Sequence, residues 1–167
     1  MFFDEARFGM KPTVGRVWSE VGTKPMVTIN PGYSNFYIAS AVNPFTGEEF
    51  TYFLDKLFTG SINQYLAALS EEKTGRKVWL IWDGAGYHRS KELVVPSNIE
   101  LIPLPPYSPE LNPVERLWAW LRRHVCRNRL YETLKRLQKA LIQKWEKLEP
   151  ALLSTLCGCS YLGHFKR

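Results

Sequence analysis

Three acidic residues, Asp4, Asp83 and Glu115, have the type and the surroundings that could do chemistry. Each aspartate belongs to an apolar, aromatic-rich run of the kind that forms a buried strand, and the glutamate lies near the start of a segment with helical character. Carboxylate oxygens are preferred ligands of hard divalent cations. A pair of such ions can stabilise both the attacking and the leaving oxygen of a phosphodiester. If the three acids converge, they therefore predict metal-assisted chemistry on phosphodiesters, and no Ser/His/Asp or Cys/His pattern with supporting context offers another reaction.

The elements that must position these acids follow a mixed α/β order in a single domain over residues 1–167. Residues 43–47 predict a turn in an antiparallel hairpin, and the unbroken apolar run 78–82 predicts a central strand covered on both faces. The expected strands are 1–8, 16–21, 35–42, 49–54, 78–82 and 99–102. The expected helices are 61–75, 90–94, 112–123 and 131–148. This order predicts an antiparallel meander that leads into parallel strands.

The two aspartates differ in how strongly their surroundings indicate a site. Asp83 ends the predicted central strand, and α/β sheets build their sites at the carboxyl ends of strands. Gly84 and Gly86 leave the following loop without side chains, so a ligand can approach its backbone closely. Asp4 has a structural alternative, because an acidic residue at a strand end often caps a turn.

Glu115 has the clearest structural alternative. With Asn112 as the N-cap and Pro113 at the first helical position, Glu115 takes the place of the glutamate in a capping box. A capping box does not require the proline-rich lead-in over residues 103–113, and that lead-in favours a functional role.

Three blocks of the chain resemble the catalytic blocks of DDE transposases of the mariner-type insertion-sequence superfamily. The likeness spans residues 1 to about 125, and the third block is highly specific. The blocks are Phe3-Asp-Glu-Ala-Arg-Phe8, Asp83-Gly-Ala-Gly-Tyr-His-Arg-Ser90 and Leu104-Pro-Pro-Tyr-Ser-Pro-Glu-Leu-Asn-Pro-Val-Glu-Arg-Leu-Trp118. The interval between the second and third acids, residues 84–114, is shorter than is common in that family.

The resemblance implies a ribonuclease-H-like fold, with Asp4, Asp83 and Glu115 as ligands of two Mg²⁺ or Mn²⁺ ions. It also implies cleavage of DNA strands at transposon ends and their transfer to target DNA, in a homodimer that holds two ends. Members of the family carry helix-turn-helix modules before the catalytic domain, and none is encoded here, so a separately made polypeptide is the expected source of end recognition. Two alternatives stay open: a structure-specific nuclease of the same fold, and an inactive remnant that only binds DNA.

Basic residues near the third block are candidates for DNA contacts, in keeping with a formal charge of +6. Scattered helix arginines also occur on faces that are merely solvated, and a loop histidine is as consistent with local hydrogen bonding as with a phosphate contact. The candidates are His88, Arg89, Arg116, Arg122 and Arg123.

Composition indicates a cytoplasmic protein, and the resemblance implies that it associates with the nucleoid when bound to DNA. No apolar run is long enough to cross a bilayer, and no secretory signal is visible. Three cysteines cannot all pair within one chain, which favours a reducing compartment. Cys157 and Cys159, with His164, form an incomplete zinc pattern, and the better interpretation is that the cysteines are incidental.

Overall fold

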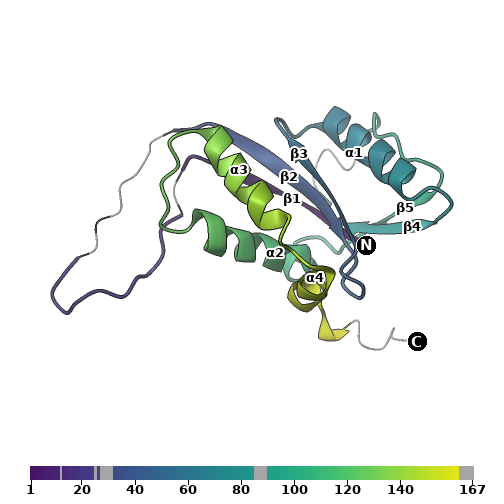
Figure 1. Cartoon of the computed structure of the whole chain (residues 1–167). Helices are drawn as coiled ribbons and strands as arrows, with labels where there is room; N and C mark the ends of the chain where they lie inside the picture. The colour runs from purple at the N-terminus through teal and green to yellow at the C-terminus, as the bar shows by residue number, and fades with distance from the viewer. Residues whose placement is uncertain (12, 25, 27–31, 85–89, 162–167) are drawn as a thin grey trace.

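The computed structural model describes residues 1–11, 13–24, 26, 32–84 and 90–161, and its centre is a five-stranded mixed sheet (Figure 1). The strands lie in the order β3-β2-β1-β4-β5. The antiparallel pairs are β1–β2 and β2–β3, and the parallel pairs are β1–β4 and β4–β5. The strands are β1 (Phe2–Gly9), β2 (Asn35–Val42), β3 (Glu49–Leu54), β4 (Val78–Trp82) and β5 (Ile99–Pro103). The predicted meander followed by parallel strands is confirmed.

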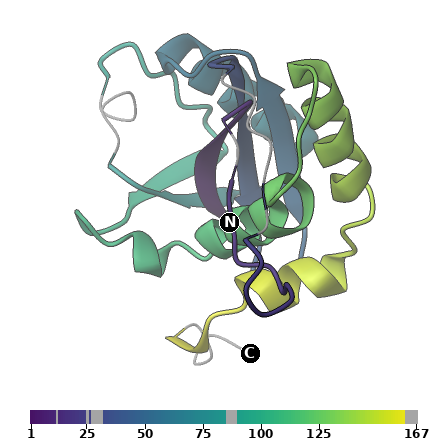
Figure 2. The ribbon, with the colours of Figure 1, turned by 90° about the vertical axis from the view of Figure 1, so that its left-hand side faces the viewer.

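Helices cover both faces of the sheet, because alternate residues of β1 point to opposite sides. Phe3 packs towards α1 (Thr59–Glu72), whereas Phe2 and Phe8 belong to the core beneath the later helices. In Figures 1 and 2, α1 lies on one side of the sheet and α3 on the other. The later elements are α2 (Val114–Leu121), the π-helical turn η3 (Arg122–Cys126), α3 (Leu134–Trp145) and α4 (Pro150–Cys157). No helix among these described elements has the length and apolar character needed to cross a membrane.

Helix boundaries differ from those predicted where side chains compete for the terminal backbone groups. The predicted helix 131–148 is shorter because Thr133 begins it, its Oγ1 accepting a hydrogen bond from the N–H of Arg136 at 3.2 Å. The predicted helix 61–75 is α1, displaced by two or three residues at each end. The predicted helix 112–123 is α2, which continues into η3.

Two predicted elements are absent. In each case the backbone groups do not make the hydrogen bonds that a strand or a helix requires. Residues 16–21 form no strand. Trp18 and Val21 are fully exposed in the excursion between β1 and β2 (dark purple in Figure 1), and no strand among the described residues pairs with this stretch. Residues 90–94 form a turn instead of a helix. There the carbonyl of Glu92 and the N–H of Val94 bond to the side chain of Asn63, at 2.9 Å each, in place of a helical ladder.

The prediction that β4 is covered on both faces is also wrong. Val78, Leu80 and Trp82 are buried on the α1 side, but Trp79, on the opposite side, is 61 % exposed. The reason is that α2 packs against β1 and β2 and leaves this part of β4 uncovered.

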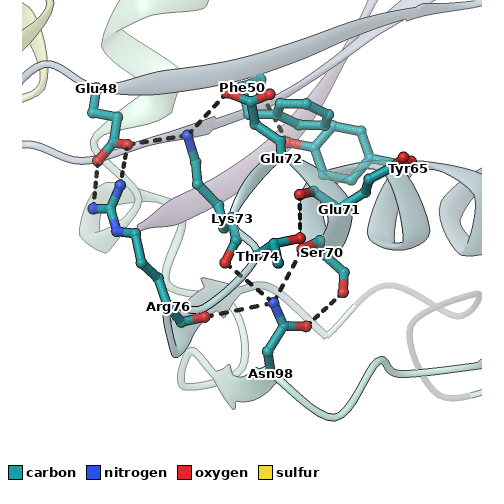
Figure 3. Close-up of polar contacts among 10 residues, drawn as sticks. All are labelled: Glu48, Phe50, Tyr65, Ser70, Glu71, Glu72, Lys73, Thr74, Arg76 and Asn98. Atoms are coloured by element: carbon teal, nitrogen blue, oxygen red, sulfur yellow. Dashed lines mark hydrogen bonds and ion pairs between the residues drawn. The ribbon is translucent and has the colours of Figure 1, made fainter.

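A polar network joins the end of α1 to the loops on both sides of it (Figure 3). Glu48 accepts hydrogen bonds from both terminal nitrogens of Arg76, at 2.8 and 3.2 Å, and its Oε1 lies 3.0 Å from the ammonium of the buried Lys73. Asn98, before β5, accepts a hydrogen bond from the hydroxyl of Ser70 and donates to the carbonyl of Ser70. This network fixes the end of α1 to the start of β4.

Candidate active site

Asp4 is buried in the middle of the sheet, at 8 % exposure. The aromatic residues Phe2, Phe3 and Phe8 favour a strand here, and their burial in the sheet also desolvates the carboxylate. The indole Nε1–H of Trp118 donates to Oδ2 of Asp4 at 2.8 Å. Because Asp4 lies within β1 and bonds to a helix residue, its alternative interpretation as the cap of a turn is wrong.

Asp83 directly follows β4, the strand that pairs in parallel with β1. Phe2 of β1 pairs with Ile81 of β4, and the two aspartates each lie two residues further along. Two residues is one full pleat, so each aspartate occupies the same side of the sheet as its paired neighbour. Phe2 and Ile81 both belong to the core on the α2 side. Asp83 is exposed and lines a cavity of about 460 Å³ whose opposite wall is the segment 105–109.

Glu115 lies near Asp4 because residues before and after it, Asn112 and Trp118, are both hydrogen-bonded to β1. Asn112, which is buried, donates from Nδ2 to the carbonyl of Phe3 at 2.9 Å and accepts the N–H of Val114 at 3.2 Å. Trp118, three residues beyond Glu115, makes the bond to Asp4. The backbone N–H of Asn112 donates to Pro109, so the reciprocal bond of a capping box is not formed. Glu115 is exposed to solvent on this anchored turn.

The electrostatics of Asp4 are dominated by burial and by neighbouring acidic groups. Desolvation by burial, followed by the negative charges of Glu115 and Glu5, raises the pKa of Asp4 from 3.8 to about 8. The hydrogen bond from Trp118 favours the charged form and opposes this shift. In the part of the chain that the structure describes, no three His, Cys, Asp or Glu side chains already stand close enough to enclose a metal ion. The donor chemistry nevertheless fits a hard cation, since Asp4 and Glu115 repel each other and Asp83 follows the neighbouring strand.

The basic candidates divide between the start and the end of α2. Arg116 is exposed, and one of its terminal nitrogens donates to the Sγ of Cys159 at 3.0 Å. Arg122 is half-buried, with its guanidinium carbon 5.4 Å from the ring centroid of Phe8, and Arg123 is exposed. His88 and Arg89 lie outside the described residues, as does His164 of the zinc pattern.

Comparison with known proteins decides the family. A family model described as "DDE superfamily endonuclease" matches residues 1–138. The chain belongs to this family. The resemblance drawn from the three blocks is thereby confirmed, and the match contains Asp4, Asp83 and Glu115.

Two curated proteins are similar to this DDE-family chain. One, described as an uncharacterized protein of Sinorhizobium fredii, is 36 % identical over 113 residues, which is 67 % of this chain and 84 % of that protein. The other, an uncharacterized 39 kDa protein of insertion element IS630 from Shigella sonnei, is 28 % identical over 156 residues. That alignment spans 88 % of this chain and 44 % of the relative.

Solved structures of Mos1 transposase share the fold. The Mos1 mariner paired-end complex with Mn matches 93 % of this chain at a TM-score of 0.72 and 16 % identity. The Mos1 catalytic domain alone matches at a TM-score of 0.65 and 14 % identity, covering 74 % of that chain. This DDE-family chain therefore has the ribonuclease-H-like fold, and it spans about half the length of the Mos1 chain in the paired-end complex.

Asn112 and Trp118 are site residues whose roles were not predicted. Trp118 is buried in the core as well as bonded to Asp4. Asn112 was expected to be the N-cap with Pro113 at the first helical position, but Pro113 is the N-cap, and the amide of Asn112 reaches β1. Both contacts join α2 or its start to β1, more than 100 residues away, so no local spacing indicated them.

Proposed function

We propose that the chain is the catalytic domain of a transposase, which cleaves DNA strands and transfers them, with Asp4, Asp83 and Glu115 holding two divalent cations. Membership in the endonuclease family supports the reaction class. The names of the relatives support transposition, because one belongs to an insertion element and the Mos1 structures are titled as complexes of a transposon end. The titles of further Mos1 complexes name Mn and Mg.

The observation that carries the proposal is the state of Asp4. A buried carboxylate faced by a second acid, with its pKa raised to about 8, is an unfavourable arrangement for the protein alone. A divalent cation held between Asp4 and Glu115 would replace the bound proton and remove the repulsion.

The residues of this chain contribute positioning. Trp118 holds one oxygen of Asp4, so that the carboxylate keeps one orientation within the core. Asn112 locks the first turn of α2 against β1 and thereby fixes the distance of Glu115 from the sheet. Asp83 stands at the open end of β4 and lines a cavity that could admit a phosphodiester.

The cations, when bound, would activate the attacking water and stabilise the leaving 3′ oxygen. Hydrolysis forms a bond from the water oxygen to phosphorus and breaks the bond from phosphorus to O3′, which leaves a 3′-OH and a 5′-phosphate. Joining uses that 3′-OH as the next nucleophile, so no covalent bond to the protein is needed.

The partners belong to the same proposal. DNA is the substrate, the active complex is a homodimer that holds two ends, and a DNA-binding region outside these 167 residues supplies end recognition. Cytoplasmic placement on the nucleoid fits the free state of Cys126, Cys157 and Cys159.

The test is cleavage of an end-labelled DNA duplex by the purified chain with Mn²⁺. Asp83→Ala, an EDTA reaction and Asp55→Ala, which changes an exposed aspartate outside the site, are the controls. The proposal expects nicking that disappears in Asp83→Ala and in EDTA but persists in Asp55→Ala, together with joined products.

Each other outcome removes a part of the proposal. Nicking without joined products indicates a nuclease of the same fold. Calorimetric Mn²⁺ binding without cleavage indicates a competent site that lacks its DNA-binding region. Neither binding nor cleavage indicates a remnant and overturns the enzymatic assignment.

A further inference from the structure

A second cavity, of about 300 Å³, lies beyond the end of β1, away from the three acids. It is enclosed by the end of β1 and the residues that follow it, by the start of β2, and by η3. The backbone closes one side, where Gly9 pairs with Asn35 and the N–H of Met10 donates to the carbonyl of Ser34 at 3.1 Å.

The charge of this cavity has one sign. Arg7, Lys11 and Arg122 line it, and no acidic side chain does. None of these three cations forms an ion pair with a carboxylate in the described part of the chain. Arg122 is held in place by the ring of Phe8, and the remaining polar lining consists of neutral donors such as Thr13 and Ser34. Such a surface suits a phosphate group, because fixed cations and neutral donors meet anionic oxygens without competition from the protein.

A different cavity shows what a neutralised basic surface looks like in the same molecule. Lys73, Arg76 and Lys77 line a cavity of about 200 Å³ near the start of β4. There Glu48 pairs with the first two cations and Glu100 lies 3.4 Å from the third. Positive charge alone is therefore not the distinguishing feature of the cavity beyond β1. Its distinguishing feature is positive charge that the protein leaves unpaired.

The cavity beyond β1 lies at the far ends of β1, which carries Asp4, and of α2, which carries Glu115. β1 and α2 run in the same direction, since Asn112 contacts Phe3, Trp118 contacts Asp4 and Phe8, and Arg122 lies over Phe8. Arg122 is seven residues beyond Glu115, a rise of ~10 Å along a helix. Arg7 and Lys11 are three and seven residues beyond Asp4, or ~10 to ~23 Å along an extended chain.

We propose that this cavity binds a backbone phosphate of the DNA strand that continues from the three acids, through Arg7, Lys11 and Arg122. The inference rests on the proposed function for the identity of the ligand as DNA. With one phosphate per ~3.4 Å of each strand, the bound phosphate lies ~3 to ~7 base pairs from the reacting one. The cavity acts as a positioning site that fixes the direction in which the strand leaves the acids.

The experiment measures DNA binding without catalysis. The affinity of a fluorescein-labelled DNA duplex is followed by anisotropy in EDTA, at salt concentrations from ~50 to ~200 mM. The test variant is Arg7→Gln/Lys11→Gln, and both side chains are exposed, so the fold should tolerate the change. The matched control is Lys135→Gln/Lys139→Gln on the exposed side of α3, which removes the same charge. Equal melting temperatures for the three proteins establish that the fold is intact.

Each lost phosphate contact lowers the slope of log K against log salt by about 0.9. One phosphate contact is lost in Arg7→Gln/Lys11→Gln, so the expected result is a slope shallower by about 1 in that variant and unchanged in the control. Equal reductions in both variants would show a general effect of net charge and overturn the site, as would an unchanged slope in both.

A competition arm distinguishes the source of the phosphate. Replacing part of the chloride by inorganic phosphate at constant ionic strength should not release the duplex from the wild-type chain, because a single phosphate lacks the other contacts of the strand. Release from the wild type alone would assign the cavity to a free phosphate group and overturn the DNA assignment. Because every measurement is made in EDTA, the outcome does not depend on whether the chain cleaves DNA.

Discussion

Two carboxylates at different places in the sheet region have opposite surroundings. Glu48, beside α1, accepts a bidentate interaction from Arg76 and lies 3.0 Å from Lys73, and hydrogen bonds from these two cations lower its pKa. Asp4, in β1, is more deeply buried and has Glu115 and Glu5 as its charged neighbours, and its pKa rises to about 8. The charges that act on Glu48 are thus those of cations, whereas the charges that act on Asp4 are those of other acids.

The difference separates a structural carboxylate from a functional one. A paired carboxylate contributes to folding in its charged form. A buried carboxylate next to another acid opposes folding when it ionises, and such arrangements concentrate at functional sites. The same distinction applies to the cations, which are paired around Glu48 and unpaired in the cavity beyond β1.

The largest expected effect is on cleavage, and the two carboxylates should differ completely. Asp4→Asn removes a proposed metal ligand and should lower Mn²⁺-dependent nicking by about 1000-fold or more, since metal ions contribute several kcal/mol to such transition states. Glu48→Gln leaves the three acids unchanged and should keep the wild-type rate. Labelled-duplex nicking assays on both variants measure the difference in rate. Comparable losses of nicking in Asp4→Asn and Glu48→Gln would contradict a special role for Asp4.

The second expected effect is on stability, with opposite signs for the two variants. Asp4 has a folded-state pKa of about 8, above the unfolded value of 3.8, so the folded chain holds a proton that the unfolded chain has released. The metal-free wild type should therefore lose stability as pH rises from ~4 to ~8, by ~1.4 kcal/mol per pH unit from this group. Asp4→Asn has no ionisable group at this position and does not lose this stability, so it should be more stable than the wild type by several kcal/mol near the upper end of that range.

Glu48→Gln should instead be destabilised, by ~1 to ~3 kcal/mol, because it leaves the buried ammonium of Lys73 without its charged partner. Urea denaturation at several pH values in EDTA measures both variants. Adding Mn²⁺ should then raise the midpoint of the wild type but not that of Asp4→Asn. A wild-type stability that does not decrease over this pH interval would contradict the state assigned to Asp4.

The sequence predicts the acids and the elements that carry them better than it predicts what holds those elements together. The short runs that contain Asp4 or precede Asp83 form strands because most of their residues are apolar and become buried in the sheet. This apolar character is local, so it can be read from the sequence. The hydrogen bonds from Asn112 to Phe3 and from Trp118 to Asp4 join residues more than 100 positions apart, and spacing within one segment does not encode such contacts.

The strand wrongly predicted at 16–21 and the unexpected exposure of Trp79 have a related cause. Both stretches have a residue composition suited to strands, but burial depends on which other element arrives to cover them. The excursion around Trp18 is joined to the body at its base, where the N–H of Gly15 donates to Asn128 at 2.9 Å. Beyond that point no strand pairs with it among the described residues.

The smallest expected effect concerns the bond that Trp118 donates to Asp4. This bond favours the charged carboxylate, so Trp118→Phe should raise the pKa of Asp4 further. A hydrogen bond to a charged group contributes ~1.5 to ~3 kcal/mol, equivalent to a rise of about one to two pKa units. The pH at which Mn²⁺-dependent nicking reaches half its maximum should increase by about one unit, with the rate recovering at higher pH.

Trp145→Phe is the matched control, because its ring lies 6.3 Å from that of Trp118 and its Nε1–H donates to Glu49 instead of Asp4. Both variants lose similar volume from one core cluster and should lose similar stability. Only Trp118→Phe should move the pH profile of nicking. An equal displacement in both would reduce Trp118 to a packing residue, and a displacement in Trp118→Phe alone would establish that this indole stabilises the charged form of Asp4 relative to the protonated form.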